Sequence, residues 1–560
     1  MWRWSLMLLA LISLAGAAWQ YRIEMVVKVT PFVRGVLSPI AENQPIVWPQ
    51  EPTVGQAAPD ARPPNIILIL TDDMGFNDIS LYNGGAADGS LKTPSIDALA
   101  QQGVSFSHGY AANAVCAPTR ATLLTGRYST RFGFEFTPIF KLGPTIFKWM
   151  NELEPPPLPV EINVAAARAL PGIEALGMPG EEITIAEVLR DRGYYTAHIG
   201  KWHLGGMPGM RPEDQGFDDS LYMAGTLYLP EAHRDVVNAK REKDPIERMV
   251  WATGRYAAQF NGGPLFQPEG YLTDYFSREA VKVIEANGHR PFFLYLAHWG
   301  IHNPLQATRE DYARFSHIED HHLRVYAAMT HALDRGVGML TAALEAQGLA
   351  DNTLIVFTSD NGGADYIGLP DINQPFRGWK LTHFEGGIHV PFMAKWPARI
   401  PQGTRYAEPV HHIDVFHTLA AAAGAEIPGD RKLDGVNLLP YVTGEAGGRP
   451  HEILFWREGH QQTVWHQGWK LIRAEHPAQA PGDAVSERIW LFHLAQDPTE
   501  QVNLAQDRPD KVQALKALLA AHNAEQAEPL WPSVINAPIR VDKVGDQPYV
   551  EGDEYIYWPN

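Results

Sequence analysis

Four short apolar runs, each followed by polar residues, recur through the first two thirds of the chain: residues 65–70, 194–199, 291–297 and 353–358. Continuous apolar runs of this length are typical of parallel strands buried on both faces. Between the last two runs, apolar positions recur every three or four residues from Leu323 to Leu344, and Gly348 follows, which predicts a long helix with a glycine stop. Strand, helix and strand in this order predict a parallel sheet covered by helices.

Each predicted strand ends in side chains that can bind ions or move protons. In chain order they are Asp72 and Asp73, Lys201 and His203, His298 and His302, and Asp360 and Asn361. Ligands of open α/β sheets bind beyond the carboxyl ends of the strands. A single Asp-Asp pair in this position is more often a turn or a helix cap, but four polar strand ends together indicate a functional site.

Asp72, Asp73, Asp360 and Asn361 offer only oxygen ligands. Three carboxylates placed together repel one another and raise one another's pKa unless a cation lies between them. Oxygen ligands favour Ca²⁺ or Mg²⁺ over zinc or copper. The sequence favours Ca²⁺ over Mg²⁺, because calcium tolerates looser geometry and is abundant outside the cytoplasm.

Lys201 and His203 are two residues apart, so an extended backbone would point both side chains to the same side. A cation and an imidazole placed together suit an anionic group, which the lysine would attract and the histidine would hydrogen-bond or protonate. The alternative is a loop with a solvated lysine and a packed histidine.

Cys116 is the single cysteine of the chain. Pro118 suits a first helical turn and Gly126 suits the position after a helix end, so Cys116 is predicted at a helix N-terminus, where an anion is favoured. Arg120 then lies one turn further on the same face. Cys116 is either a thiolate nucleophile or a buried small hydrophobe, but a thiolate needs no hard cation, so the oxygen ligands indicate another chemistry.

Composition narrows the function classes. The 560 residues include 46 Lys and Arg against 64 Asp and Glu, which gives a net charge of −18, and 45% are hydrophobic. This amino-acid composition is typical of globular proteins. The excess of acidic residues argues against a nucleic-acid partner, since phosphate binding needs a surplus of Lys and Arg. One cysteine excludes an intramolecular disulfide, a cysteine-rich zinc site and an iron–sulfur cluster.

Residues 1–18 are predicted to be a signal peptide or an N-terminal anchor. Arg3 precedes an uncharged apolar run from Trp4 to Trp19, and Ala15-Gly16-Ala17 fits a cleavage site. The run is shorter than the roughly 20 residues that cross a bilayer. We expect an exported protein, periplasmic or secreted, with membrane contact only through a retained anchor. Residues 19–61, rich in proline in their second half, are expected to form an extended strap.

The rest of the chain divides into three further parts. We expect a catalytic domain over 62–440, in which the irregular stretches 131–180 and 205–270 shape the substrate pocket. Four short strand-like runs and a helix then predict a small antiparallel α+β subdomain over 441–530. Residues 531–560 are expected to be a tail that follows the surface.

The segment Cys116-Ala117-Pro118-Thr119-Arg120, continued by Leu124-Thr125-Gly126-Arg127, resembles the signature of the type I sulfatases. The resemblance extends from about residue 62 to 525, and the stretches 293–297 and 379–387 are most similar to the arylsulfatase B branch. It implies the α/β fold of the alkaline phosphatase superfamily: a large, mostly parallel sheet between helices. It also implies that a separate maturing enzyme converts Cys116 to formylglycine. The implied reaction is hydrolysis of aryl sulfates and of a sulfated carbohydrate, such as a 4-sulfated hexosamine.

The resemblance assigns roles residue by residue. The Ca²⁺ ligands would be Asp72, Asp73, Asp360, Asn361 and the modified Cys116. Arg120 would hold the formylglycine, whose hydrate has one hydroxyl to attack sulfur and a second whose deprotonation expels sulfate. Lys201 and Lys380 would bind the sulfate, His203 would contact the formylglycine hydroxyl, and His302 would protonate the leaving oxygen as general acid. His298 would only support the site. Thr119 replaces a more usual serine, and His389 a frequent arginine or lysine.

Two other functions stay open at this point. A phosphonate monoester or phosphodiester hydrolase of the same superfamily would keep the fold and change the substrate. A non-catalytic binder of sulfated glycans would keep calcium without maturing Cys116.

Overall fold

The computed structural model describes residues 21–49, 62–82, 84–85, 89–241, 245–476, 486–545 and 547–560. The predicted signal peptide or anchor over 1–18 and residues 50–61 of the expected strap lie outside these ranges. The described residues include no helix with the length and hydropathy that crossing a bilayer requires.

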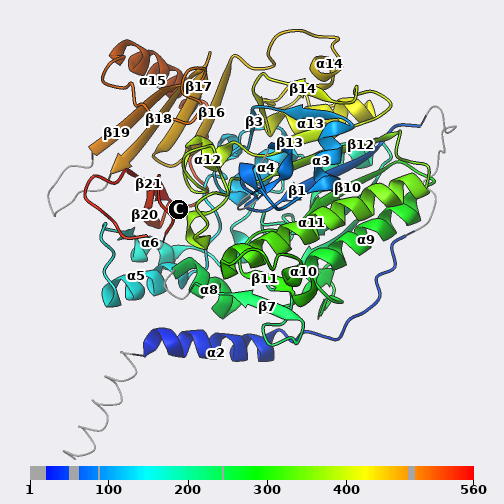
Figure 1. Ribbon diagram of the computed structural model, residues 1–560, viewed down its shortest axis with the longest axis horizontal. Coiled ribbons are helices and arrows are strands. Elements are labelled where there is room, and N and C mark those ends of the chain that lie inside the picture. The colour runs from blue at the N-terminus through cyan, green and yellow to red at the C-terminus, as the bar shows by residue number, and fades with distance from the viewer. Residues whose placement is uncertain are drawn as a thin grey trace, which may run out of the picture.

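All four predicted strands lie side by side in the middle of one sheet (Figure 1). They are β1 (Asn65–Thr71), β5 (Tyr195–Gly200), β10 (Phe292–Ala297) and β12 (Thr353–Ser359). Their order is β12-β1-β10-β5, and each neighbouring pair is parallel, as predicted. Their carboxyl ends therefore meet at one edge of the sheet.

Six further described strands extend this sheet to ten. On one side lie β13 (Phe392–Lys395), β2 (Val104–Phe106) and β14 (Thr404–Tyr406); on the other lie β6 (Asp219–Met223), β8 (Ala258–Phe260) and β9 (Leu265–Phe266). β6 pairs parallel with β5, whereas β13 and β8 pair antiparallel with their inner neighbours. The sheet is therefore mostly parallel at its centre and mixed at its edges.

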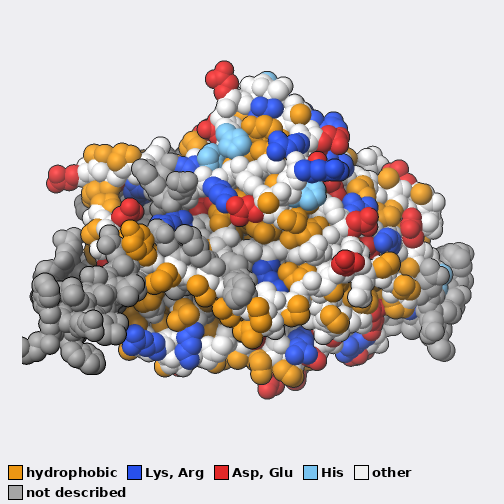
Figure 2. Space-filling view, turned by 90° about the horizontal axis from the view of Figure 1, so that it is seen from below, with side chains coloured by type: hydrophobic (Ala, Val, Ile, Leu, Met, Phe, Trp, Pro, Cys, Tyr) orange, Lys and Arg blue, Asp and Glu red, His pale blue; other side chains and the backbone are white. Residues whose placement is uncertain are grey.

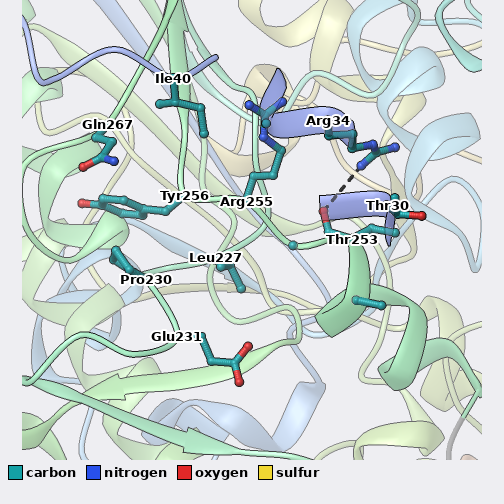
Figure 3. Close-up of a pocket in the computed structure, with 13 residues that line it drawn as sticks. Thr30, Arg34, Ile40, Leu227, Pro230, Glu231, Thr253, Arg255, Tyr256 and Gln267 are labelled. Atoms are coloured by element: carbon teal, nitrogen blue, oxygen red, sulfur yellow. Dashed lines mark hydrogen bonds between the residues drawn. The ribbon is translucent and has the colours of Figure 1, made fainter. Parts of the chain in front are cut away.

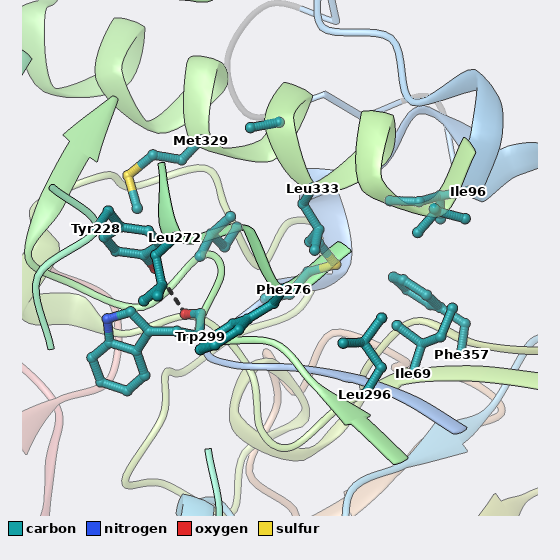
Figure 4. Close-up of a cluster of buried hydrophobic side chains, with 14 of the residues drawn as sticks. Ile69, Ile96, Tyr228, Leu272, Phe276, Leu296, Trp299, Met329, Leu333 and Phe357 are labelled. Atoms are coloured by element: carbon teal, nitrogen blue, oxygen red, sulfur yellow. Dashed lines mark hydrogen bonds between the residues drawn. The ribbon is translucent and has the colours of Figure 1, made fainter. Parts of the chain in front are cut away.

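Helices cover both faces of the sheet, which explains the unbroken apolar runs. Ile67 and Ile69 of β1 belong to one core, beneath helices α3 (Pro94–Gln101), α9 (Leu272–Asn287) and α11 (His321–Ala346). Figure 4 shows Leu272, Phe276 and Leu333 of α9 and α11 in this core. The alternate residues of β1 belong to a second core with helices α4 (Cys116–Thr125), α7 (Ile185–Asp191) and α13 (Ile413–Ala423).

The C-terminal subdomain has the predicted antiparallel α+β architecture. Its strands are β16 (Ile453–Glu458), β17 (Gln461–His466), β18 (Trp469–His476) and β19 (Ser486–His493), and helix α15 (Pro509–Asn523) packs on them. Lys470 of β18 joins the subdomain to the large domain, because its buried Nζ lies 2.7 Å from Glu385 and 2.8 Å from Glu500. His389 contacts the same Glu385 at 2.9 Å, so its effect is structural.

Two expectations were wrong in part. The first half of the strap is helix α2 (Arg22–Leu37), because the proline-rich composition begins only at Pro39. The tail over 531–560 is a hairpin of β20 (Ile535–Arg540) and β21 (Tyr555–Pro559), which pairs with β4 (Glu161–Ile162) and buries Ile556 and Tyr557. A surface-following tail would not place these two side chains in the interior.

The stretches expected to be irregular also contain regular elements. They hold α5 (Gly143–Leu153), α6 (Val164–Ala169), β7 (Val236–Ala239) and α8 (Pro245–Thr253) besides β6, β8 and β9. The remaining short elements are β3 (Gly109–Tyr110), β11 (Leu305–Thr308), α10 (Arg309–Arg314), α12 (Glu385–Ile388), β15 (Val410–His411) and α14 (Leu439–Val442).

Candidate active site

Asp72 and Asp73 follow β1 at the carboxyl edge of the sheet, and both are buried. Asp73 has a left-handed backbone with φ of 57°, and its N–H donates to Asp360 Oδ1 at 3.2 Å. This contact joins the end of β1 to the end of β12. The sequence expectation that these strand ends meet is therefore confirmed.

Cys116 is the first residue of α4, and Gly126 ends this helix with φ of 67°, as the sequence predicts. The Sγ atom of Cys116 lies 3.6 Å from Asp72 Oδ1 and 3.8 Å from Asp73 Oδ1. Burial and the charge of Asp360 raise the pKa of the thiol well above its usual range. The thiol is therefore neutral at physiological pH, and the structure gives no support to a thiolate nucleophile.

Arg120 connects three strand ends. Its guanidinium donates to Asp360 Oδ2 at 2.8 and 3.0 Å, to Asp72 Oδ2 at 2.9 Å and to the carbonyl oxygen of Lys201 at 3.1 Å. The side chain is completely buried. A buried guanidinium with these acceptors fixes the positions of the ends of β1, β5 and β12 relative to α4.

Two lysines complete the ionic cluster. Lys201 Nζ lies 2.7 Å from Asp72 Oδ2, and Lys380 Nζ lies 2.7 Å from Asp73 Oδ1. Burial alone would raise the pKa of Asp73, but the charges of Lys380 and Lys201 hold it well below its usual range. With Arg120, three cations thus face three carboxylates. The repulsion expected among the carboxylates is relieved by side chains of the chain itself.

His203 lies near this cluster, but not for the reason given by the sequence. Its φ is 64°, so the backbone is left-handed rather than extended, and strand alternation does not set its direction. Burial, with the charges of Lys201 and Arg120, lowers its pKa well below the usual range. Its Nδ1 is buried without a hydrogen-bond partner among the described residues, so the neutral ring has an unused polar atom.

His302 contacts both members of one ion pair. Its Nε2 lies 3.4 Å from Asp73 Oδ2 and 3.4 Å from Lys380 Nζ, while its Nδ1–H donates to Asn303 O at 2.6 Å. Burial lowers the pKa of the ring well below its usual range. The Nε2 atom is therefore the one available to a reacting group.

Sequence reasoning missed two aromatic residues of the site. Tyr366 OH donates to Asp73 Oδ2 at 3.2 Å and accepts from Lys380 Nζ at 3.2 Å. Trp299 stacks on His302 with 4.0 Å between ring centroids. Trp299 directly follows a polar strand end, which is a weak signal, whereas nothing in the glycine-rich loop around Tyr366 distinguishes that residue.

His298 lies apart from the cluster. It is completely buried, and neither ring nitrogen has a hydrogen-bond partner among the described residues. Burial alone lowers its pKa to about 3, with no contribution from the charged groups of the site. Among the described residues, no hydrogen bond joins His298 to the site, so the expectation that it supports the site stays a prediction.

The donor set fits a hard cation. Ligand atoms of Asp72, Asp73, Cys116 and His302 all lie within 4.8 Å of one another. Asn361 Nδ2 donates to Asp73 Oδ1 at 2.8 Å, whereas Asn361 Oδ1 is buried without a partner among the described residues. A buried amide oxygen without a donor beside two carboxylates is a suitable ligand for Ca²⁺ or Mg²⁺.

Comparison with known proteins identifies the family. Residues 64–425 match the family model described as Sulfatase. The chain belongs to the sulfatase family. This sulfatase is therefore a sulfuric ester hydrolase, and the mostly parallel sheet with its antiparallel C-terminal subdomain is the fold of that family.

Three relatives illustrate the likeness. The sulfatase is 32% identical to the steryl-sulfatase of Mus musculus, over 84% of this chain and 83% of the relative. It is 31% identical to the N-acetylgalactosamine-6-sulfatase of Homo sapiens, over 83% and 86%. The crystal structure of Ps i-CgsB in complex with k-i-k-neocarrahexaose superposes with a TM-score of 0.67 at 31% identity, covering 84% of this chain and 95% of that chain. None of these three is named as an arylsulfatase B, so the closer likeness to that branch stays a prediction.

Proposed function

We propose that the sulfatase hydrolyses sulfate monoesters of a sulfated carbohydrate, and aryl sulfates, with formylglycine formed from Cys116 as nucleophile and Ca²⁺ as cofactor. The observation that carries the proposal is the charge arrangement around Cys116. Three carboxylates and three cationic side chains lie within one buried cluster, and their formal charges cancel.

A neutral cluster does not attract an anionic ester, which supports a divalent cation at this site. Ca²⁺ held by Asp72, Asp73, Asp360 and Asn361 would add two positive charges and would leave the cluster with a net charge of +2. It would also compete for Asp72 and Asp73 and so release Lys201 and Lys380 for the sulfate oxygens. When bound, the cation supplies electrostatic stabilisation of the charge on those oxygens.

Modification of Cys116 is supported by its surroundings. The neutral thiol is a weak nucleophile. It lies beside two carboxylates that suit a hard cation, and such a cation prefers oxygen ligands to a sulfur ligand. A hydrated formylglycine supplies two hydroxyls on one carbon, one for attack on sulfur and one for release of sulfate. Arg120 lies one helical turn away, where it holds the carboxylates in place. The maturing enzyme that would act on the Cys116 segment is part of this proposal.

His302 is the proposed general acid. Its Nε2 faces Lys380 and Asp73, and its Nδ1–H is held by Asn303 O, which fixes the ring. The neutral ring carries its proton on Nδ1, so Nε2 first takes a proton from the Lys380 ammonium, 3.4 Å away, and then passes it to the leaving oxygen, while solvent reprotonates Lys380. His203 is the proposed contact of the formylglycine hydroxyl, through the ring atom that has no partner in the described structure.

The names of the relatives support a sugar ester as substrate. One relative is an N-acetylgalactosamine-6-sulfatase, and Ps i-CgsB was crystallised with k-i-k-neocarrahexaose. The steryl-sulfatase likeness makes steryl sulfate the necessary comparison substrate. The uncharged run from Trp4 to Trp19 further supports export to the periplasm or the outside of the cell.

Turnover assays with four substrates test the function. An aryl sulfate, a 6-sulfated or 4-sulfated N-acetylgalactosamine, steryl sulfate and an aryl phosphodiester would be compared for kcat/KM. We expect turnover of the aryl sulfate and of a sugar sulfate. Faster turnover of the phosphodiester would support the phosphodiesterase alternative. If the wild type binds a sulfated glycan without turnover, and Cys116→Ala still binds it, the non-catalytic glycan binder would be supported.

A further inference from the structure

Helix α2 exposes an apolar face to solvent. Six large hydrophobic side chains on α2 or at its start are between 42% and 76% exposed: Tyr21, Met25, Val29, Val33, Val36 and Leu37. Their spacing of three or four residues from Tyr21 to Val36 places them along one side of the helix, which we call the α2 apolar face. A surface helix of a globular protein normally turns such a side toward the core. This helix turns it away from the body of the protein.

Helix α5 extends this apolar surface. Phe140, Leu142 and Leu153, at the two ends of α5, are also exposed. Arg34 lies over the Phe140 ring at 5.1 Å, and Arg22 forms a 3.1 Å ion pair with Glu152, so the two helices run side by side. The two helices and the residues that directly precede them hold nine of the fifteen exposed large hydrophobic side chains of the described residues. Scattered apolar residues need no explanation, but a cluster of this size marks an interaction surface.

The charge of α2 is opposite to that of the chain. Its sequence contains three basic residues, Arg22, Lys28 and Arg34, and one acidic residue, Glu24, within a chain of net charge −18. Figure 2 shows the underside of the molecule as it is drawn in Figure 1, where hydrophobic side chains gather with Lys and Arg among them. Apolar and basic side chains on one surface helix suit an anionic lipid surface, whereas the rest of this acidic protein would be repelled by it.

A groove beside α2 adds one further basic residue, Arg255. It has a volume of about 360 Å³ and lies between α2 and the segments 227–231 and 252–256 (Figure 3). Arg34 and Arg255 line it, and neither forms an ion pair with a carboxylate among the described residues. Arg34 donates to Thr253 O at 3.5 Å and Arg255 donates to Ser38 O, so both are held at the groove. They are suitable partners for lipid phosphates.

The chain before α2 identifies the occupant of the apolar face. Residues 4–19 are an uncharged apolar run, and only Gln20 and Tyr21 separate this run from α2 in the sequence. We propose that α2 is an interfacial helix that lies flat on an anionic lipid bilayer, with the α2 apolar face in the outer acyl region and Arg34 and Arg255 at the phosphates. This binding surface is separate from the catalytic cluster and does not depend on the proposed sulfatase chemistry.

Site-specific fluorescence on the full chain tests the proposal. Cys116 is buried, so an environment-sensitive dye attached to V33C reports on α2, and the same dye on V502C, exposed in the C-terminal subdomain, is the matched control. Vesicles of mixed phosphatidylglycerol and phosphatidylcholine are then added. We expect the emission on V33C to rise and shift to the blue, with no change on V502C. A retained N-terminal anchor would also bring α2 near the bilayer, so a triple serine variant that keeps residues 4–19 separates the two cases.

A triple variant gives the second reading. Val29→Ser, Val33→Ser and Val36→Ser together should weaken binding to the same vesicles at least about tenfold. The reason is that the variant no longer buries three valine side chains in the bilayer. The triple variant Ile427→Ser, Val502→Ser and Val550→Ser, which removes equally exposed side chains elsewhere, should not. Equal turnover of an aryl sulfate would show that both variants are folded. No change on V33C, an equal change on V502C, or a change on V33C with protein concentration alone, as for a second copy, would overturn the proposal.

Discussion

The indole ring of Trp299 stacks on the imidazole of His302, with 4.0 Å between the ring centroids and 23° between the planes. The same indole lies under Lys201, whose Nζ is 4.9 Å from the ring centroid, and its Nε1–H donates to Thr226 O at 2.9 Å. Tyr228 OH donates to the carbonyl oxygens of both Trp299 and His302 at 2.8 Å. One ring therefore sets the orientation of two proposed catalytic groups.

Trp299→Ala should lower kcat for an aryl sulfate about 10-fold to 100-fold, because His302 and Lys201 lose the surface that orients them. Trp299→Phe keeps a ring to stack on and should recover most of the activity. Steady-state kinetics that separate kcat from KM give the reading. A purely structural role would lower the melting temperature of both variants and leave kcat of the folded fraction unchanged.

His302→Ala should slow esters with poor leaving groups far more than esters with good ones. A nitrophenolate leaves without a proton, whereas a sugar alkoxide needs one. The measurement is kcat/KM across a series of aryl and sugar sulfates of graded leaving-group pKa. If His302 is the general acid, the logarithm of kcat/KM depends more steeply on that pKa in the variant than in the wild type. Equal losses across the series would contradict the assignment.

Removal of divalent cations should abolish turnover and lower the melting temperature. Chelation followed by dialysis is the treatment, and Ca²⁺ should restore both properties better than Mg²⁺, because Ca²⁺ accepts less regular oxygen coordination than Mg²⁺ does. Asn361→Ala removes the buried amide oxygen that is the proposed ligand without altering charge, so it should raise the Ca²⁺ concentration needed for half activity about 10-fold or more. Full activity after exhaustive chelation would show that the three carboxylates and three cationic side chains of the cluster support catalysis without a divalent cation.

The four central strands of the sheet could be predicted because each of them is a recognisable apolar run in the sequence. An unbroken apolar run such as 65–70 reports burial on both faces, and parallel strands bring their carboxyl ends together. Asp72 and Asp360 are therefore close in space although 288 positions apart in sequence. The position of Cys116 on α4 followed in the same way from Pro118 and Gly126.

The residues that the sequence did not reveal depend on the tertiary structure. His203 takes a left-handed backbone that no local pattern requires, and Tyr366 reaches Asp73 from a single 3-10 helical turn, too short to leave a periodic pattern. The ion pairs of Lys201 and Lys380 with Asp72 and Asp73 form only once four strand ends and a distant loop meet. Helix α2 was missed because prolines further along the chain dominated the composition of the segment.

Asp78 should make the stability of the protein fall as the pH rises. It is completely buried, and burial raises its pKa to about 8 despite hydrogen bonds from Tyr326 OH and Gly75 N–H at 2.6 Å. In the unfolded chain an aspartate has a pKa of about 4. Between these values the folded state binds more protons than the unfolded state, so the stabilisation present below pH 4 is lost progressively up to pH 8, at about 1 kcal/mol per pH unit.

Asp78→Asn should remove this contribution, because an amide does not titrate. Denaturant unfolding at several pH values between 5 and 8 gives the slope of stability against pH. The slope should become less negative in the variant, and Asp507→Asn, at an exposed position, should leave it unchanged. An unaltered slope in Asp78→Asn would mean that another group carries the pH dependence.

The central claim is that Cys116 becomes the nucleophile after conversion to formylglycine. Peptide mass spectrometry of the tryptic fragment Thr93–Arg120, from protein produced in its native host, tests it most directly. We predict that residue 116 is found as formylglycine or its hydrate in protein that turns over sulfate esters. An unmodified thiol throughout, in material that is equally active, would contradict the account.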